Sequence, residues 1–225
     1  MSTWKPALAI AAKDLTIEWR NRTALLTATV FAILVLLIFV FARDPGVIAL
    51  PVLAPAVLWV ALALASLVAL NRAFLLEREH AALDGILLSP APRAALFWGK
   101  WLANLCFVLV VQAVAFPLWI LFFNVPPSGA LVLVAGVAIL TAIGFTAVGT
   151  VLAAMAVRTR FAELLLPVLL LPFMLPPVFF AAQLTTRLLA GRPADELWGW
   201  IRLLSLYDVV FLAVATLLFP VVVEE

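Results

Sequence analysis

The sequence predicts an all-α integral membrane protein with six transmembrane helices. Hydrophobic residues make up 67% of the 225 residues and charged residues only 12%, a composition that a water-soluble globule could not bury. The apolar residues gather in six runs, each close to the roughly 20 residues that a helix needs to cross a hydrocarbon core of about 30 Å. The runs lack the alternation of polar and apolar residues that marks transmembrane strands, so helices are expected.

The first expected element is an interfacial helix over residues 4–22. Its apolar residues recur at three- and four-residue intervals, as in a helix that lies in the membrane surface: Trp4, Leu8, Ala11, Leu15 and Trp19. The alternative is a solvated, positively charged anchor with its tryptophans at headgroup level. Charged residues in this stretch would interrupt the apolar core of a signal peptide, so we expect no cleavage.

Six membrane spans follow this helix. They are expected at residues 23–42, 47–70, 101–123, 130–157, 164–182 and 203–223. The fifth run contains four prolines, which remove backbone donors and free carbonyl groups in lipid: Pro167, Pro172, Pro176 and Pro177. We therefore expect this helix to break near Pro176-Pro177 and to be followed by short amphipathic outer-face helices within residues 179–200.

The distribution of lysine and arginine predicts the orientation in the membrane. With six spans, both termini lie on one side, together with loop 71–100 between the second and third spans. That side holds ten of the 14 lysines and arginines, and cytoplasmic flanks carry the excess of positive charge. We therefore expect both termini and loop 71–100 in the cytoplasm. The positive residues are a topology signal and not a nucleic-acid-binding face.

Several kinds of active site are missing from the sequence. Gly99-Lys100 is followed by Trp101 instead of a hydroxyl residue and lacks the glycine needed at position 94, so it is not a phosphate-binding loop. His80 is the only histidine and Cys106 the only cysteine, so no nucleophilic triad can be assembled. His80 lies near Glu77, Glu79 and Asp84 in one loop. A metal site needs several ligands on converging elements, so a solvated or partner-facing histidine is expected in preference to a metal ligand. We therefore expect neither a catalytic site nor a bound cofactor or metal on this chain.

Loop 71–100 is the only long polar stretch between the apolar runs, and its residues suit a docking helix. Leu83, Ile86 and Leu87 form one apolar face, while Gly85 and Pro90 limit the helix. The order of these residues resembles the cytoplasmic coupling element of exporter-type ABC permeases, in which a short amphipathic helix fits a cleft on a separate ATPase subunit. The resemblance assigns ATPase coupling to Glu77, Arg78, Glu79, Leu83, Gly85, Ile86, Leu87, Ser89 and Pro90. The alternative is an ordinary juxtamembrane loop.

Within that group the chain resembles the CcmB family, the ABC-2-like permease subunits of the cytochrome c maturation system that are also called haem exporter protein B. The resemblance rests on stretches spread along nearly the whole chain: Lys13 to Leu15 with Glu18 to Arg20, Leu70 to Phe74 with Glu77 to Glu79, Leu83 to Pro90, Leu164 to Phe180, Tyr207-Asp208 and Glu224-Glu225. It implies a multi-pass protein of the bacterial cell inner membrane.

The resemblance also implies a heterocomplex. Its expected members are an ABC ATPase subunit of the CcmA kind that carries ATP-Mg, two permease copies, membrane partners of the CcmC and CcmD kinds, and a periplasmic haem chaperone of the CcmE kind. Haem is expected on the partners, because the outer side of this chain is expected to contain no histidine. We expect the chain to couple ATP hydrolysis to release of the haem-loaded chaperone, with direct haem export as the nearer alternative.

Asp208 is the second candidate for a functional role. With the sixth span starting near residue 203, it is expected about a turn and a half into that span from the outer face, where a carboxylate is unfavourable unless paired, protonated or near water. Asp208 and the adjacent Tyr207 are therefore candidates for outer-face gating or partner contact. In the alternative, the span begins later and both residues mark its interfacial end.

A different class of function stays open, either a secondary transporter or an ATPase-independent membrane scaffold. Ion-coupled carriers place ionisable residues near the membrane midplane. The spans are expected to offer only amides such as Asn104 and Gln112 at depth, which disfavours a carrier. Co-purification with an ATPase would separate a coupled permease from a scaffold.

Overall fold

The computed structural model describes residues 3–44, 50–79, 92–157 and 162–224. Every regular element in these ranges is an α-helix: α1 (Trp4–Asn21), α2 (Thr23–Ala42), α3 (Leu50–Glu79), α5 (Arg93–Phe122), α6 (Ala130–Val157), α7 (Ala162–Leu189) and α8 (Ala194–Glu224). Six of them, α2 to α8, contain a segment long and apolar enough to cross a membrane. The predicted all-α, six-span architecture is therefore confirmed.

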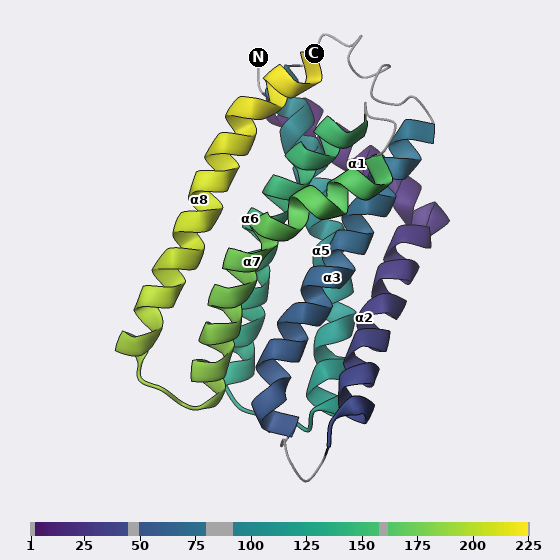
Figure 1. Ribbon diagram of the computed structural model, residues 1–225. Helices are drawn as coiled ribbons and strands as arrows, with labels where there is room; N and C mark the ends of the chain where they lie inside the picture. Colours follow the sequence, from purple (N-terminus) through teal and green to yellow (C-terminus); the bar gives the residue numbers. More distant parts are fainter. Residues whose placement is uncertain (1–2, 45–49, 80–91, 158–161, 225) are drawn as a thin grey trace.

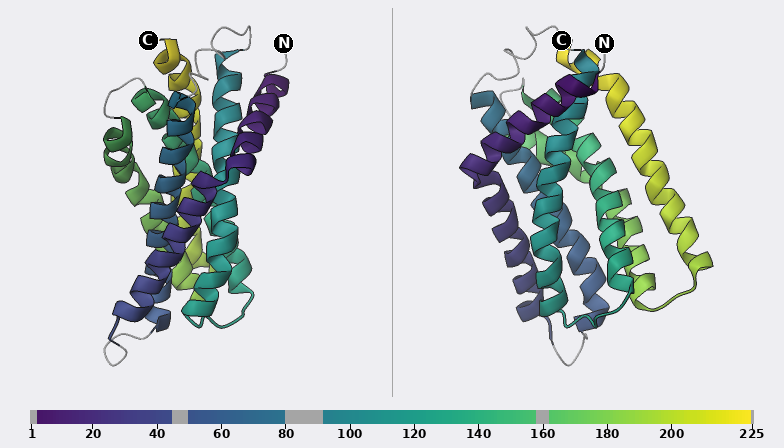
Figure 2. Two further views of the ribbon diagram at one scale, coloured as in Figure 1. Left: turned by 90° about the vertical axis from the view of Figure 1, so that its right-hand side faces the viewer. Right: turned by 180° about the vertical axis from the view of Figure 1, so that it is seen from behind.

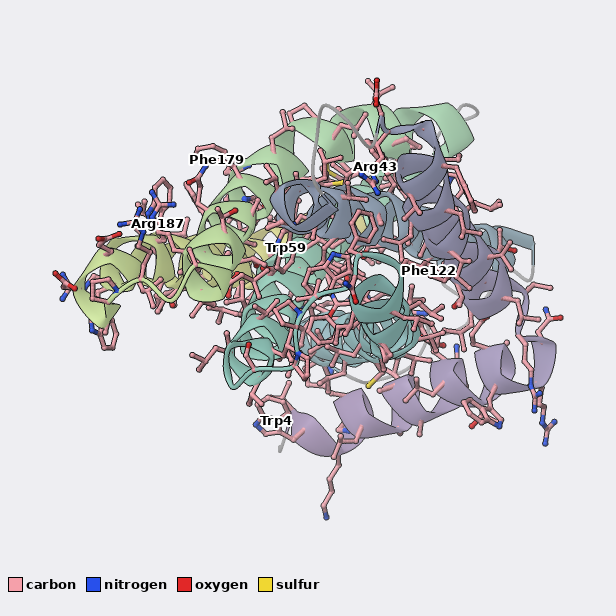
Figure 3. The ribbon with its side chains drawn as sticks, turned by 90° about the horizontal axis from the view of Figure 1, so that it is seen from below. Trp4, Arg43, Trp59, Phe122, Phe179 and Arg187 are labelled. Atoms are coloured by element: carbon pink, nitrogen blue, oxygen red, sulfur yellow. The ribbon has the colours of Figure 1, made fainter. Side chains whose placement is uncertain are left out.

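The spanning helices form one bundle, and α1 lies across one of its ends (Figure 1). Both chain termini lie at this same end, and so do the last turns of α3 and the first turns of α5. Within the bundle α6 packs against α7 and α8, while α2 packs against α3. The core is filled by large side chains that are almost wholly buried, among them Trp59, Trp119 and Phe97. Seen along the bundle, Trp59 lies near its centre and Trp4 at its edge (Figure 3).

Two of the predicted spans have the observed bounds, and the other four helices are longer than predicted. α2 and α6 coincide with the runs expected at 23–42 and 130–157. α3 continues to Glu79 and α5 already begins at Arg93, so both helices extend into the predicted loop 71–100. The polar residues at these ends favour water over lipid, but nothing in them interrupts a helix. The two spans therefore reach beyond the apolar runs toward the segment between them.

The predicted break at Pro176-Pro177 is wrong, and so are the separate outer-face helices. α7 is helical through all four of its prolines and ends only at Leu189. A Schellman turn stops it there: Gly191 has φ +64°, its N–H donates to Leu188 O at 3.1 Å, and the Arg192 N–H donates to Arg187 O at 3.0 Å. Because α8 starts at Ala194, residues 179–200 belong to the ends of two long helices.

The prolines of α7 are accompanied by a bend in the helix. Its first half runs obliquely across the bundle, and its second half turns to run alongside α6 toward the turn before α8 (Figure 1). Each proline lacks the N–H that would bond the carbonyl four residues earlier, and its ring pushes that carbonyl aside. Kinks of this kind are attributed to proline in long helices. The effect of the prolines is thus a bend in α7 and not an end.

The predicted N-terminal helix exists and has two different faces. Ala7 and Ala11 are buried, whereas Trp4, Leu8 and Trp19 are more than half exposed. The helix crosses the start of α5 (Figure 2) and contacts α5 far more extensively than it contacts α2, its neighbour in sequence. One face of α1 is therefore bound to the bundle, and the apolar face that it leaves outside suits the surface of a membrane.

Candidate functional site

The residues predicted to contact an ATPase lie at or beyond the end of α3. The backbone of Glu77, Arg78 and Glu79 forms the last turn of this helix. The other predicted coupling residues fall between 80 and 91, outside the described residues: Leu83, Gly85, Ile86, Leu87, Ser89 and Pro90. The structure therefore places the start of the predicted coupling segment, at the same end of the bundle as both termini (Figure 1), and leaves its docking surface a prediction.

Asp208 and Tyr207 lie deeper than the sequence indicated. α8 begins at Ala194, so Asp208 is the fifteenth of its 31 residues and lies roughly 21 Å along the helix from its first residue. The expectation that the spans carry only amides at depth is therefore wrong. The interfacial alternative required a span that begins later than residue 203, whereas α8 begins earlier. The difference arises because the polar segment around Asp195 and Glu196 is itself helical.

The carboxylate of Asp208 is packed inside the protein. The residue is 4% exposed, and neither carboxylate oxygen has a hydrogen-bond partner among the described residues. A buried carboxylate without a partner is strongly unfavourable, and intramembrane ionisable residues that persist mark functional sites by default. The environment of Asp208 is thus the strongest chemical anomaly in the described part of the chain.

Gly144 of α6 makes room for Asp208. It lies near the middle of α6, opposite Asp208, and a Cβ at this position would overlap the Oδ1 atom of Asp208. The same Cβ would come within 2.9 Å of the Tyr207 ring, closer than real Cβ contacts. A larger residue would require these side chains to shift, so α6 and α8 are closely packed where α8 carries its carboxylate. We call the contact of Gly144, Tyr207 and Asp208 the α6–α8 seam.

Tyr207 ties this seam to α7. Its hydroxyl donates a hydrogen bond of 2.7 Å to the carbonyl of Phe173. That carbonyl would normally accept the N–H of residue 177, which is a proline and has none. The ring of Tyr207 also lies 4.3 Å from that of Phe211, centroid to centroid. A donor from α8 therefore replaces the one that α7 lacks, and Tyr207 joins the seam to the proline-bent helix.

Further polar side chains lie along the buried face of α5. The amide of Asn104 donates to Thr150 Oγ1 of α6 at 2.9 Å. Two turns farther on, Gln112 is 7% exposed. It lines a recess with Ser66 and Thr141, whose hydroxyls bond carbonyls of their own helices. The cavity volume of this recess is only about 10 Å³, far below the roughly 300–1,000 Å³ of usual ligand sites.

Sequence reasoning missed Gly144, whose role depends on a residue 64 positions later. A glycine in the middle of an apolar run signals close helix packing, but it does not name the partner. Among the described residues no three His, Cys, Asp or Glu side chains converge as metal ligands. His80 lies outside these residues.

Comparison with known proteins covers nearly the whole chain. The family model described as CcmB protein matches residues 5–225. A relative from Bradyrhizobium diazoefficiens is named Heme exporter protein B and is 32% identical over 187 residues, which cover 81% of this chain and 82% of the relative. A protein of the same name from Pseudomonas aeruginosa is 30% identical over 87% of each chain, and one from Rhodobacter capsulatus is 29% identical over 80% of this chain and 82% of its own.

Proposed function

Because the chain belongs to the CcmB family, we propose that it is the membrane permease subunit of an ABC-type haem-export complex that serves cytochrome c maturation. The observation that carries this proposal is the family match over residues 5–225. In this proposal the chain couples ATP binding and hydrolysis on a partner ATPase to release of a haem-loaded periplasmic chaperone. The chain itself is a multi-pass inner-membrane protein without catalytic activity.

The proposed complex divides the chemistry among its members. A CcmA-like ATPase binds ATP-Mg and docks on the coupling segment from the cytoplasm. CcmC-like and CcmD-like membrane proteins hold haem, and a CcmE-like chaperone receives it. The complex is proposed to contain two ATPase subunits and two copies of the permease. Neither nucleic acid nor a resident cofactor of this chain has a role.

The arrangement of helices supports transmission through the bundle. α3 and α5 flank the predicted coupling segment, and α3 packs on both α6 and α7 while α5 packs on α6 and α8. A displacement of the ends of α3 and α5 therefore reaches the three helices that meet at the α6–α8 seam. Packed interiors respond to such displacement by switching between discrete arrangements. We assign to Asp208 and Tyr207 the role of a gating contact in this switch.

Direct haem export is the second candidate, and the names of the relatives favour it. Two features of the chain support transmission instead. Histidine and tyrosine are common ligands of haem iron. The only histidine, His80, is expected in the cytoplasmic loop, and the only tyrosine, Tyr207, bonds the Phe173 carbonyl. The recess beside Gln112 is also smaller than usual ligand sites. Purified permease without its partners is therefore expected to show no stoichiometric haem spectrum.

ATPase docking is tested by reversing the acidic pair at the end of α3. We expect the double variant Glu77→Lys, Glu79→Lys, and separately Gly85→Pro, to lose the co-purifying ATPase while still inserting into the membrane, since no span is altered. The matched control is Asp195→Lys with Glu196→Lys, an acidic pair in the first turn of α8 at the other end of the bundle. A wild-type ratio of ATPase to permease in the two test variants would refute the coupling assignment and favour a scaffold or an ion-coupled carrier.

Gating is tested at Asp208. We expect Asp208→Ala to assemble with the ATPase normally but to let haem-loaded chaperone accumulate, because hydrolysis no longer changes the outer side of the bundle. Normal cytochrome maturation in this variant would remove Asp208 from the mechanism. A haem spectrum of purified permease that disappears on replacement of a residue of this chain would instead establish direct export.

The proposed orientation has its own test. Reporters fused at Ser89 and after Glu225 are expected on the cytoplasmic side, and one inserted near Gly191 on the periplasmic side. A periplasmic signal from the Ser89 fusion would place the coupling segment away from any cytoplasmic ATPase.

A further inference from the structure

The N-terminal helix α1 packs mainly on α5, although α2 is its neighbour in the sequence. A single residue, Arg22, separates it from α2, and this residue has a left-handed backbone with φ 56°. Yet α1 lies across α5, which begins 71 residues later at Arg93 (Figure 2). α1 has a short connection to α2 but its main packing on α5.

The backbones of α1 and α5 touch. A Cβ at Gly99 of α5 would come within 2.7 Å of the carbonyl oxygen of Ala7 and 2.8 Å of the Cβ of Ile10. Neither atom belongs to the far end of a flexible side chain, so neither could move aside alone. On the α1 side, the small residues Ala7 and Ala11 are buried in the contact. Such close approach leaves the two helices little freedom to slide past each other.

A buried ion pair lies beside this contact. The ammonium of Lys100 is 2.8 Å from Asp14 Oδ2, and the side chains of Lys100 and Asp14 are only 5% and 14% exposed. Lys13 also approaches Asp14, with its Nζ 3.0 Å from Oδ1, but its side chain is 40% exposed. Separating Lys100 from Asp14 would strand charge in a poorly solvated place. This pair therefore opposes separation of the helices more than the pair with Lys13 does.

Aromatic rings continue the attachment toward the N-terminus. The rings of Trp4 on α1 and Trp98 on α5 have centroids 5.5 Å apart. Trp98 in turn stacks edge-on against Trp101, at 5.3 Å. The contact thus extends along α1 from Trp4 to Asp14. We call the contact of Ala7, Ala11 and Asp14 with Gly99 and Lys100 the α1–α5 clamp.

The other end of α1 is held differently. Glu18, 2% exposed, accepts a hydrogen bond of 3.0 Å from the N–H of Leu25 in the first turn of α2. This bond satisfies one of the free donors at a helix N-terminus. This hydrogen bond lies close to Arg22. It holds α1 and α2 together at their junction, but the two helices do not pack along their lengths.

We propose that α1 and the first turns of α5 move as one rigid unit, held by the α1–α5 clamp, and that this unit turns relative to α2 about Arg22 when the partner ATPase binds ATP. Asp14, Gly99 and Lys100 are positioning residues for this movement. The proposal rests on the proposed function, because α5 directly follows the predicted coupling segment. Its consequence is that ATP binding shifts the apolar outer face of α1 in the membrane surface.

Distances between spin labels test the movement without disturbing the clamp. With Cys106→Ser removing the single cysteine, labels are attached to cysteines at the exposed positions Ala12 on α1 and Leu34 on α2, and at the partly exposed Ala94 in the first turn of α5. In the permease–ATPase complex, ATP is expected to change the α1–α2 distance by about 2 Å or more, as in helix shifts of this kind. The α1–α5 distance is expected to stay the same.

Variants of the ion pair test its part in coupling. Lys100→Met and Asp14→Asn are expected to retain the ATPase but to slow cytochrome maturation about tenfold, which corresponds to about 1.4 kcal/mol. The charge exchange Asp14→Lys with Lys100→Asp is expected to restore part of the rate, which a loss of folding alone would not explain. Lys13→Met, the control, removes the more exposed partner of the same carboxylate and is expected to mature cytochromes normally.

The outcomes separate this inference from the function on which it rests. If wild-type permease binds no ATPase, both the proposed function and the rigid-unit inference are refuted. If the ATPase binds and ATP changes the α1–α5 distance as much as the α1–α2 distance, the rigid unit alone is refuted. The same holds if Lys13→Met slows maturation as much as Lys100→Met does.

Discussion

Two helix contacts in this protein are built from the same two parts, a glycine and a carboxylate, and differ in what surrounds the carboxylate. In the α1–α5 clamp, Gly99 admits α1 and Asp14 pairs with Lys100 at 2.8 Å. In the α6–α8 seam, Gly144 admits α8, and the oxygens of Asp208 have no hydrogen-bond partner among the described residues. The carboxylate of the clamp is therefore paired with an ammonium group, whereas the carboxyl group of the seam has no such partner among the described residues.

The difference indicates which contact is stable and which one is ready to change. Breaking the clamp would leave an ammonium and a carboxylate poorly solvated, so the clamp resists opening. Opening the seam would give Asp208 access to water or to a partner group, so part of the energy lost in packing would be regained. We therefore expect the clamp to transmit force and the seam to respond to it.

The largest effect is expected from removing the glycine of the seam. Gly144→Ala places a methyl group on Asp208 and Tyr207, and overpacking of this kind destabilises by about 2–3 kcal/mol, or roughly 5–10 °C in Tm for a chain of this size. Thermal unfolding in detergent measures the change. Gly136→Ala in the same helix is the control, because a Cβ there meets nothing within 4 Å. Equal Tm values for the two variants would show that the seam is not tightly packed.

Neutralising one charge is expected to lower stability in the clamp but not in the seam. Lys100→Met removes the buried partner of Asp14, and because Lys13 remains close, we expect a loss of about 1–2 kcal/mol. Asp208→Asn keeps the shape of the side chain but removes an unpaired charge-bearing group, so we expect Tm to stay the same or rise. A fall in Tm for Asp208→Asn as large as that for Lys100→Met would mean that Asp208 has a partner in the folded protein.

The smallest effect is expected at the hydrogen bond between Tyr207 and Phe173. Tyr207→Phe leaves the Phe173 carbonyl without its donor and is expected to lower stability by about 1 kcal/mol. Adding Pro177→Ala supplies the backbone N–H that α7 lacks there, so the double variant is expected to recover most of this loss. Strictly additive effects of the two substitutions would contradict the idea that Tyr207 substitutes for the missing donor.

Run length and local signals predicted the parts of the fold that depend on neighbouring residues. The bounds of α2 and α6 follow from uninterrupted apolar runs between polar or turn-forming residues. The continuity of α7 could not be predicted in this way, because the donor to Phe173 comes from a residue 34 positions away. The depth of Asp208 was underestimated because hydropathy marks the apolar part of a helix and not its first residue.

The candidate site was predictable only in part. Asp208 stood out as a carboxylate in an apolar run, and its residue type was sufficient to single it out. Gly144 and the pairing of Asp14 with Lys100 depend on how helices are placed in space, which residue spacing within one helix does not contain. One local clue was present: Asp14 and Glu18 are four residues apart, so they lie on one side of α1, and both are turned toward the protein.

The Asp14–Lys100 pair also has a consequence for biosynthesis. The two residues are 86 positions apart, and at about 5–20 residues per second the ribosome needs roughly 4–17 s to make the intervening chain. During that interval α1 has been synthesised, but the helix against which it packs has not. During this time the tryptophans of α1 can contact lipid headgroups, so the nascent helix is expected to lie at the membrane surface until α5 is made. Formation of the clamp is consequently a late step of assembly, because it requires that the third span, α5, has been inserted.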